Sequence, residues 1–277
     1  MTVREKILRV LFYATLGAIV VVSVFPFYYA IISSLKSGTD LFRVSYVPYP
    51  IDFSNYISVL NQGSFVRNVF NSLFVALLVV IISIGLAVGA SYAIARIRFK
   101  GRGILMMLIL SISMFPPIAV LPGMFQLITV LELSNSLISL LFSYMIFTIP
   151  FTVWVFNAFM REFPKELEHA ALVDGASTAT IIMRVFLPVL WPAVVSIGLL
   201  TFIAAWNEFL FALTFISSDP KRTAPVAIAL LSGSTNHEIP WGNIMAASVI
   251  VTLPLVVLVL VFQRKIISGL AAGAIKG

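Results

Sequence analysis

The stretch FPKELEHAALVDGASTATIIMRVFLPVLWP, which runs from Phe163 to Pro192, is the polar interruption around which the rest of the chain is organised. Only 10% of the 277 residues are charged. However, a window of twenty residues inside this stretch, 165–184, contains six ionisable side chains: Lys165, Glu166, Glu168, His169, Asp174 and Arg184. A polar cluster of this density in an apolar chain marks a segment that lies outside the hydrophobic body of the protein.

The local pattern of this stretch predicts two short helices with a break between them. Pro164 suits the start of a helix, and the glutamates that follow favour the positive end of its dipole. Asp174-Gly175 is expected to end the first helix, Ser177 or Thr178 to cap the second, and Pro188 with Pro192 to interrupt it. This local pattern alone fits an ordinary loop as well as a docking element.

The composition predicts an integral membrane protein. Hydrophobic residues make up 60% of the chain, and the charged share is well below the roughly 25% of soluble domains. The net charge of +7 comes from basic residues in short groups between apolar runs, which is typical of membrane topology and disfavours nucleic-acid binding. With no cysteine, disulfides and thiolate metal sites are excluded.

Six apolar segments are long enough to cross a bilayer, which needs about 20 residues. The predicted fold is therefore an all-α membrane protein with six transmembrane helices. A retained first span is expected, because the N-terminal apolar run is longer than that of a signal peptide. The six segments are residues 10–33, 68–95, 104–131, 137–160, 193–216 and 243–263.

The distribution of lysine and arginine predicts the orientation. Of the 18 such residues, 13 lie in the connections on one side and five on the other, and positive connections stay in the cytoplasm. Both termini and residues 163–192, between spans four and five, are thus expected to be cytoplasmic. The outer connections, residues 34–67 and 217–242, are either ordered surfaces for an external partner or plain loops.

Polar and helix-breaking residues inside the spans suggest a substrate path. Glu208, beside Asn207, is the only charged residue within a predicted span, and such a residue is expected to face the protein interior or water. An interhelical hydrogen bond explains this pair equally well. Span three carries Pro116, Pro117, Pro122 and Gly123, which are expected to kink or unwind it along the path.

The sequence lacks the motifs that common enzyme classes require. It contains no phosphate-binding loop, no H-E-x-x-H zinc motif and no G-x-S-x-G nucleophile motif, and its two histidines are His169 and His237. We therefore expect no catalytic residues, no metal site and no ATP hydrolysis by this chain itself.

The pattern HAALVDGA-(x)11-P-(x)3-P, which starts at His169, resembles the permease subunit of a binding-protein-dependent ABC importer. In that family a segment E-A-A-x-x-D-G-A followed by spaced prolines docks the ATPase. This chain has His169 where the family has glutamate, with Glu168 just before it. The resemblance implies a cytoplasmic coupling helix of the type I ABC importer kind, with coupling residues Glu168, His169, Ala170, Ala171, Asp174, Gly175, Ala176 and Pro188.

Three further segments resemble the carbohydrate permeases of the maltose-transport type: NSLFVA at residues 71–76, WNEFLFAL at 206–213 and GLAAGAIKG at 269–277. This resemblance implies a homologous second permease, an ATPase dimer that carries ATP and Mg²⁺, and an external sugar-binding protein. It also implies a second docking site for the ATPase in the tail (264–277), at Ala272, Gly273, Lys276 and Gly277.

The resulting hypothesis is a single permease domain, residues 1–277, that moves a sugar into a prokaryotic cell by alternating access, and it is not an enzyme. The expected substrate path comprises Asn207, Glu208, Pro116, Pro117 and Gly123. A permease for another small solute remains an alternative. An ion- or proton-coupled carrier that uses Glu208 is a further one, although it would lack a partner charge.

Overall fold

A computed structural model describes residues 3–47, 49–231 and 239–274, with side chains described as far as Gln263. These residues form helices and connections without strands. They divide into two compact units, residues 1–65 with 228–253 and residues 66–227 with 254–277. Helices α12 (Ala224–Leu231) and α13 (Trp241–Ala274, containing Pro254) each contribute to both units.

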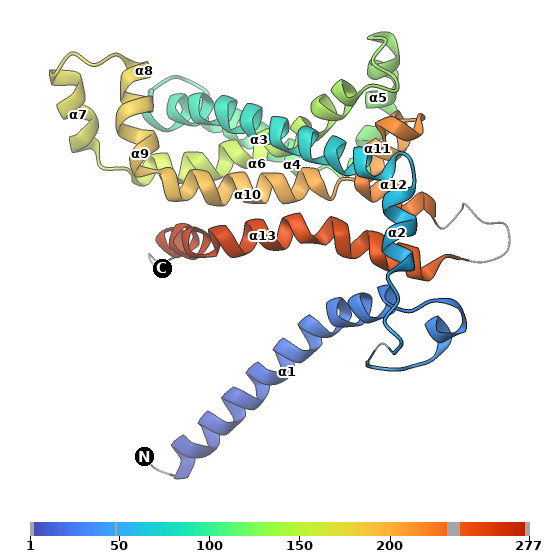
Figure 1. Cartoon of the computed structure of the whole chain (residues 1–277). Helices are drawn as coiled ribbons and strands as arrows, with labels where there is room; N and C mark the ends of the chain where they lie inside the picture. The colour runs from blue at the N-terminus through green and yellow to red at the C-terminus, as the bar shows by residue number, and fades with distance from the viewer. Residues whose placement is uncertain (1–2, 48, 232–238, 275–277) are drawn as a thin grey trace. The chain divides into compact units, whose positions relative to one another are not determined.

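The larger unit is built around α6 (Leu137–Glu162), which packs against α4 (Arg102–Ser113), α10 (Trp191–Trp206) and the short α11 (Leu210–Phe215). Helix α3 (Phe65–Arg96) joins this bundle (Figure 1). The Ser83 hydroxyl of α3 lies 2.9 Å from that of Thr148 in α6. Small residues at such contacts allow close helix packing in an apolar environment.

Two pairs of helices are sharply bent, and one of them forms the predicted third span. Helix α4 and α5 (Pro117–Val130) meet at 95°, and the break falls at the predicted Pro116-Pro117. Pro122 and Gly123 were expected to break the same span, but both lie within the continuous helix α5. The segment Thr178–Val189 meets α10 at 83°, at the second pair of prolines.

The fifth predicted span, residues 193–216, is wrong as one continuous helix. Helix α10 ends at Trp206, and α11 begins at Leu210. Glu208 lies in the connection between them, and its carboxylate accepts hydrogen bonds from backbone N–H groups at the start of α11. The hydrophobicity of residues 193–216, which is uniformly high, does not reveal the break between α10 and α11.

In the part of the chain that the structure describes, four helices are long and apolar enough to cross a membrane: α1 (Val3–Ser34, containing Pro26), α3, α6 and α13. The total is six if each bent pair counts as one span. Five of the six predicted spans correspond to these four helices and to the bent pair of α4 and α5, whereas the other bent pair shares only residues 193–206 with the predicted fifth span. Side chains of α1 from Arg4 to Tyr28 are exposed, as expected of an apolar helix that lies against lipid or another chain.

The smaller unit contains an ordered connection after α1, as predicted for residues 34–67. It includes the 3₁₀ turn η1 (Gly38–Phe42) and α2 (Ser54–Asn61). The side chain of Asn55 donates hydrogen bonds to the carbonyls of Ser34, at 3.0 Å, and Lys36, at 2.7 Å. Nearby, hydrogen bonds from Ser37 and Ser54 hold the pKa of the Asp52 carboxyl below its usual value. These contacts fold the connection back onto the end of α1.

On the other side of Asn55 lies Gly242, at the start of α13. A Cβ atom at Gly242 would approach the Asn55 amide to 2.5 Å, closer than real side chains come. Because Asn55 is buried and held by two hydrogen bonds, it has no freedom to move aside.

We predict that Gly242→Ala lowers the free energy of unfolding by about 1–3 kcal/mol, through overpacking and lost hydrogen bonds. The measurement is thermal unfolding of the detergent-solubilised chain. Gly63→Ala is the matched control, because a Cβ at Gly63 meets nothing within 4 Å. Equal melting temperatures for the two variants would contradict the prediction.

Candidate functional site

Residues 163–192 form the predicted pair of helices. Helix α7 (Lys165–Val173) is followed by a second limb made of α8 (Thr178–Thr180), a π-helical segment η2 (Ile181–Phe186) and α9 (Leu187–Val189). The two limbs pack side by side as a hairpin at one end of α10 (Figure 1). We call residues 163–190 the coupling hairpin, after the role that the sequence predicts for this segment.

The turn of the hairpin follows from its local sequence. Gly175 has a φ of +75°, the left-handed conformation that glycine adopts without strain. The N–H of Ala176 bonds to the carbonyl of Ala171 at 2.9 Å, and that of Gly175 to Leu172 at 3.0 Å, which closes the end of α7. Ser177 then caps α8 by accepting from the N–H of Thr180. The predicted helix end at Asp174-Gly175 and the predicted cap of the second helix are both confirmed, and the capping residue is Ser177.

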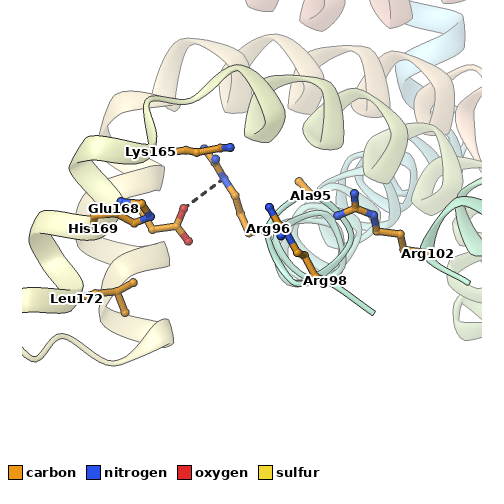
Figure 2. Close-up of a pocket in the computed structure, with 8 residues that line it drawn as sticks. All are labelled: Ala95, Arg96, Arg98, Arg102, Lys165, Glu168, His169 and Leu172. Atoms are coloured by element: carbon orange, nitrogen blue, oxygen red, sulfur yellow. Dashed lines mark ion pairs between the residues drawn. The ribbon is translucent and has the colours of Figure 1, made fainter. Parts of the chain in front are cut away.

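Glu168 fixes the hairpin to the end of α3. The Tyr92 hydroxyl donates to Glu168 Oε1 at 2.8 Å, and Arg96 Nε lies 3.4 Å from Oε2, an ion pair without hydrogen-bond alignment (Figure 2). Arg96 Nη2 also donates to the Phe163 carbonyl at 2.5 Å. The Arg96 and Glu168 side chains are only 6% and 12% exposed. We call Glu168, Arg96 and Tyr92 the anchor.

Aromatic rings surround the anchor. Phe163 and Phe186 stack with centroids 4.1 Å apart, and Tyr92 meets Phe186 edge to face at 5.5 Å. The Arg96 guanidinium lies 5.3 Å from the Phe186 centroid, within the range of a cation–π contact. These residues belong to a buried cluster that continues into α10 through Ile197. The hairpin is therefore packed to both α3 and α10.

The hairpin also exposes apolar side chains outside the anchor, beside polar ones such as Glu166 and Arg184. Val173 is 88% exposed and Met183 is 64% exposed. Of the predicted coupling residues, Glu168 points inward, Ala171 and Ala176 pack against the core, and the others are exposed: His169, Ala170, Asp174, Gly175 and Pro188. Exposed apolar residues around a fixed turn are typical of a protein interaction surface.

A pocket of about 410 Å³ opens between α7 and the end of α3 (Figure 2). Its polar walls carry four basic side chains and one carboxylate, and that carboxylate is Glu168 of the anchor. The lining residues are Ala95, Arg96, Arg98, Arg102, Lys165, Glu168, His169 and Leu172.

The residues predicted to line a substrate path lie in two places. Asn207 is exposed and donates to the carbonyl of Ile203 at 2.9 Å. Glu208 accepts from the N–H groups of Phe211, at 2.8 Å, and Ala212, at 3.2 Å. Both residues thus satisfy local backbone groups, and the carboxylate caps a helix start, where the dipole favours a negative charge.

The predicted path residues of span three, Pro116, Pro117 and Gly123, are exposed near the bend between α4 and α5. Helix α5 packs against α11, with Phe125 and Phe215 rings 6.3 Å apart. Helix α11 is therefore the neighbour common to Glu208 and α5. A substrate path along these residues stays a prediction.

Sequence reasoning missed two of the three residues of the anchor. Tyr92 and Arg96 lie on α3, more than 70 residues before Glu168, within a predicted span and the basic connection that follows it. The π-helical turn was missed as well. The one available signal was Arg96 itself, a basic residue at the very end of an apolar run.

The tail predicted as a second docking site is only partly described. Ala272 and Gly273 belong to α13, whereas Lys276 and Gly277 lie outside the described residues, as does His237. Among the described residues, no group of three or more His, Cys, Asp or Glu side chains could hold a metal ion.

Residues 81–271 match the family of binding-protein-dependent transport system inner membrane components. The chain belongs to this family. It is thus a membrane permease subunit, not an enzyme.

Two relatives match nearly the whole chain. The trehalose/maltose transport system permease protein MalG of Thermococcus litoralis is 40% identical over 99% of this chain and 99% of its own length. The trehalose transport system permease protein SugB of Mycobacterium tuberculosis is 34% identical over 97% and 98%.

A solved structure has the same fold. It is a chain of a bacterial ABC transporter involved in the import of the acidic polysaccharide alginate, with a TM-score of 0.81 over 95% of this chain and 98% of that chain. At 22% identity this likeness concerns the fold alone. The predicted all-α permease fold is confirmed.

We predict that Glu168→Ala lowers the free energy of unfolding by about 3 kcal/mol, because it leaves Arg96 buried without its counter-charge. Thermal unfolding in detergent measures the effect. Glu166→Ala, an exposed carboxylate on the same helix, is the matched control and should change stability little. Equal effects of the two variants would show that the anchor contributes nothing.

We predict that Glu208→Ala loosens the start of α11 by about 1 kcal/mol, the usual value of a lost helix cap. Hydrogen exchange at the amides of Phe211 and Ala212 should accelerate several-fold in Glu208→Ala and less in Glu208→Gln, which keeps one acceptor oxygen. Unchanged exchange in Glu208→Ala would refute the capping role.

Proposed function

We propose that this chain is one of two homologous permease subunits of an ATP-driven importer that takes up a sugar, a di- or oligosaccharide, by alternating access. The relatives that match almost its full length are named as trehalose/maltose and trehalose permeases, which supports a sugar substrate. In this proposal an external binding protein delivers the sugar, and a separate ATPase dimer binds ATP and Mg²⁺. A second similar structure is that of a bacterial alginate ABC transporter in complex with an alginate pentasaccharide-bound periplasmic protein, which supports the proposed external binding protein.

The observation that carries the proposal is the coupling hairpin, which presents an exposed face and is held by its buried face. We propose that the ATPase docks on the exposed face with both chain termini in the cytoplasm. Ala170, Asp174 and Gly175 would meet the ATPase there. Ala171 and Ala176 would let the hairpin pack closely on the bundle behind it.

The roles of Glu168 and His169 then separate. Successive residues of an α-helix point about 100° apart, so the inward Glu168 and the outward His169 serve different surfaces. In this proposal His169 occupies the position that faces the ATPase, and Glu168 positions the hairpin from inside. The tail residues Ala272, Gly273, Lys276 and Gly277 form the second proposed contact with the ATPase.

The hairpin would transmit ATPase closure to the bundle as a rigid lever. Its anchor binds α3, and Phe186 and Leu190 belong to the cluster that includes α10. A displacement of the exposed turn therefore displaces both helices together. The alternative of an ion-coupled carrier loses support, because the oxygens of Glu208 already accept backbone hydrogen bonds.

We predict that Gly175→Val uncouples the complex while the chain still inserts into the membrane. A β-branched residue at φ +75° costs about 1–2 kcal/mol, which the turn relieves by changing its conformation. Sugar-stimulated ATPase activity of the reconstituted complex should fall severalfold.

Gly175→Asn is the matched control, because asparagine tolerates the left-handed conformation, and nothing lies within 4 Å of a Cβ at this position. It should retain most of the coupling. Unchanged sugar-stimulated ATPase activity in Gly175→Val would overturn the lever proposal.

A further inference from the structure

The pocket beside α7 is lined by more positive than negative side chains, and the proposed coupling function gives this excess positive charge no role. Glu168, the one carboxylate in its lining, is already bonded to Arg96 and Tyr92. The remaining cations are Arg98, Arg102 and Lys165, and among the described residues none of them has an ion-pair or hydrogen-bond partner. Three cations around one hollow repel one another unless an anion lies among them.

The arrangement of these cations suits a phosphate group. Arg98 and Arg102 come from the connection after α3 and the first residue of α4, and Lys165 approaches from the first residue of α7 (Figure 2). They surround a pocket of about 410 Å³, which is large enough for a phosphodiester head group. Arginine guanidinium groups bind phosphate oxygens in pairs, and lysine adds a point charge.

The surroundings of the pocket favour a lipid over a free anion. The next turns of α4 expose large apolar side chains, with Ile104 67%, Met107 71% and Leu108 59% exposed. Helix α3, a candidate membrane span, ends at Arg96, and a span that ends there would place the pocket at the level of the lipid head groups. Basic pockets at this level attract anionic lipids, at about 1 kcal/mol per Lys or Arg.

We propose that this pocket binds the phosphate of an anionic phospholipid. Arg98 and Arg102 hold the phosphate from one wall, and Lys165 from the other. The site does not depend on the docked ATPase, and the lipid would contact α7 directly.

The test is binding of a fluorescent short-chain phosphatidylglycerol to the full chain in neutral detergent, without ATPase. The double variant Arg98→Gln/Arg102→Gln should weaken binding at least about tenfold. Lys100→Gln is the matched control, because Lys100 carries the same charge in the same connection but does not line the pocket. Equal weakening in both would overturn the proposal.

Two further outcomes would also overturn it. One is displacement of the lipid by inorganic phosphate at equal concentration, which would assign the pocket to a free anion. The other is unchanged lipid affinity in the double variant together with poorer copurification of the ATPase, which would assign it to an acidic protein surface.

If the double variant does not elute as a monodisperse helical protein, Lys165→Gln tests the opposite wall. It should weaken phosphatidylglycerol binding about fivefold. Wild-type affinity in a well-folded Lys165→Gln would count against the proposal.

Discussion

The ion pair between Glu168 and Arg96 is the contact on which the position of the coupling hairpin depends. At 3.4 Å the two charges attract each other by about 5 kcal/mol for an effective dielectric constant of 20, before the cost of removing them from water. The hydroxyl of Tyr92 donates a hydrogen bond to Glu168, and the carbonyl of Phe163 accepts one from Arg96, and both bonds lower that cost. If either Arg96 or Glu168 lost its partner, its charge would be buried among aromatic rings without compensation, which would destabilise the fold. The hairpin is therefore held in one orientation.

This orientation divides α7 into faces with different tasks. Glu168 and Ala171 face the bundle, whereas Lys165, His169 and Leu172 recur at spacings of three and four and line the basic pocket. Ala170 and Val173 remain exposed to a partner. A helix of nine residues thus has a buried, a basic and an apolar exposed side. Each side follows from the helical period once Glu168 is fixed inward.

Local features of the fold were predictable from the sequence, and contacts between distant segments were not. The break at Pro116-Pro117 and the turn at Gly175 depend on the backbone limits of proline and glycine, which act within a few residues. The pairing of Arg96 with Glu168 joins residues 72 positions apart, so no local pattern contains it. Glu208 was misplaced because hydrophobicity alone does not register a carboxylate that caps a new helix. Pro122 stayed within α5 because a membrane helix tolerates a proline when neighbouring groups satisfy the freed carbonyl.

The basic pocket and the proposed ATPase surface meet at His169, and this has a thermodynamic consequence. His169 lines the pocket and is exposed, and it is the residue proposed to face the ATPase. A lipid phosphate in the pocket and an ATPase on the hairpin would both contact α7. Any change that the lipid makes in the affinity for the ATPase must equal the change that the ATPase makes in the affinity for the lipid. Because Glu168 keeps α7 fixed to α3, this coupling would act through the contacts of His169 and the charge of Lys165, without displacement of the helix.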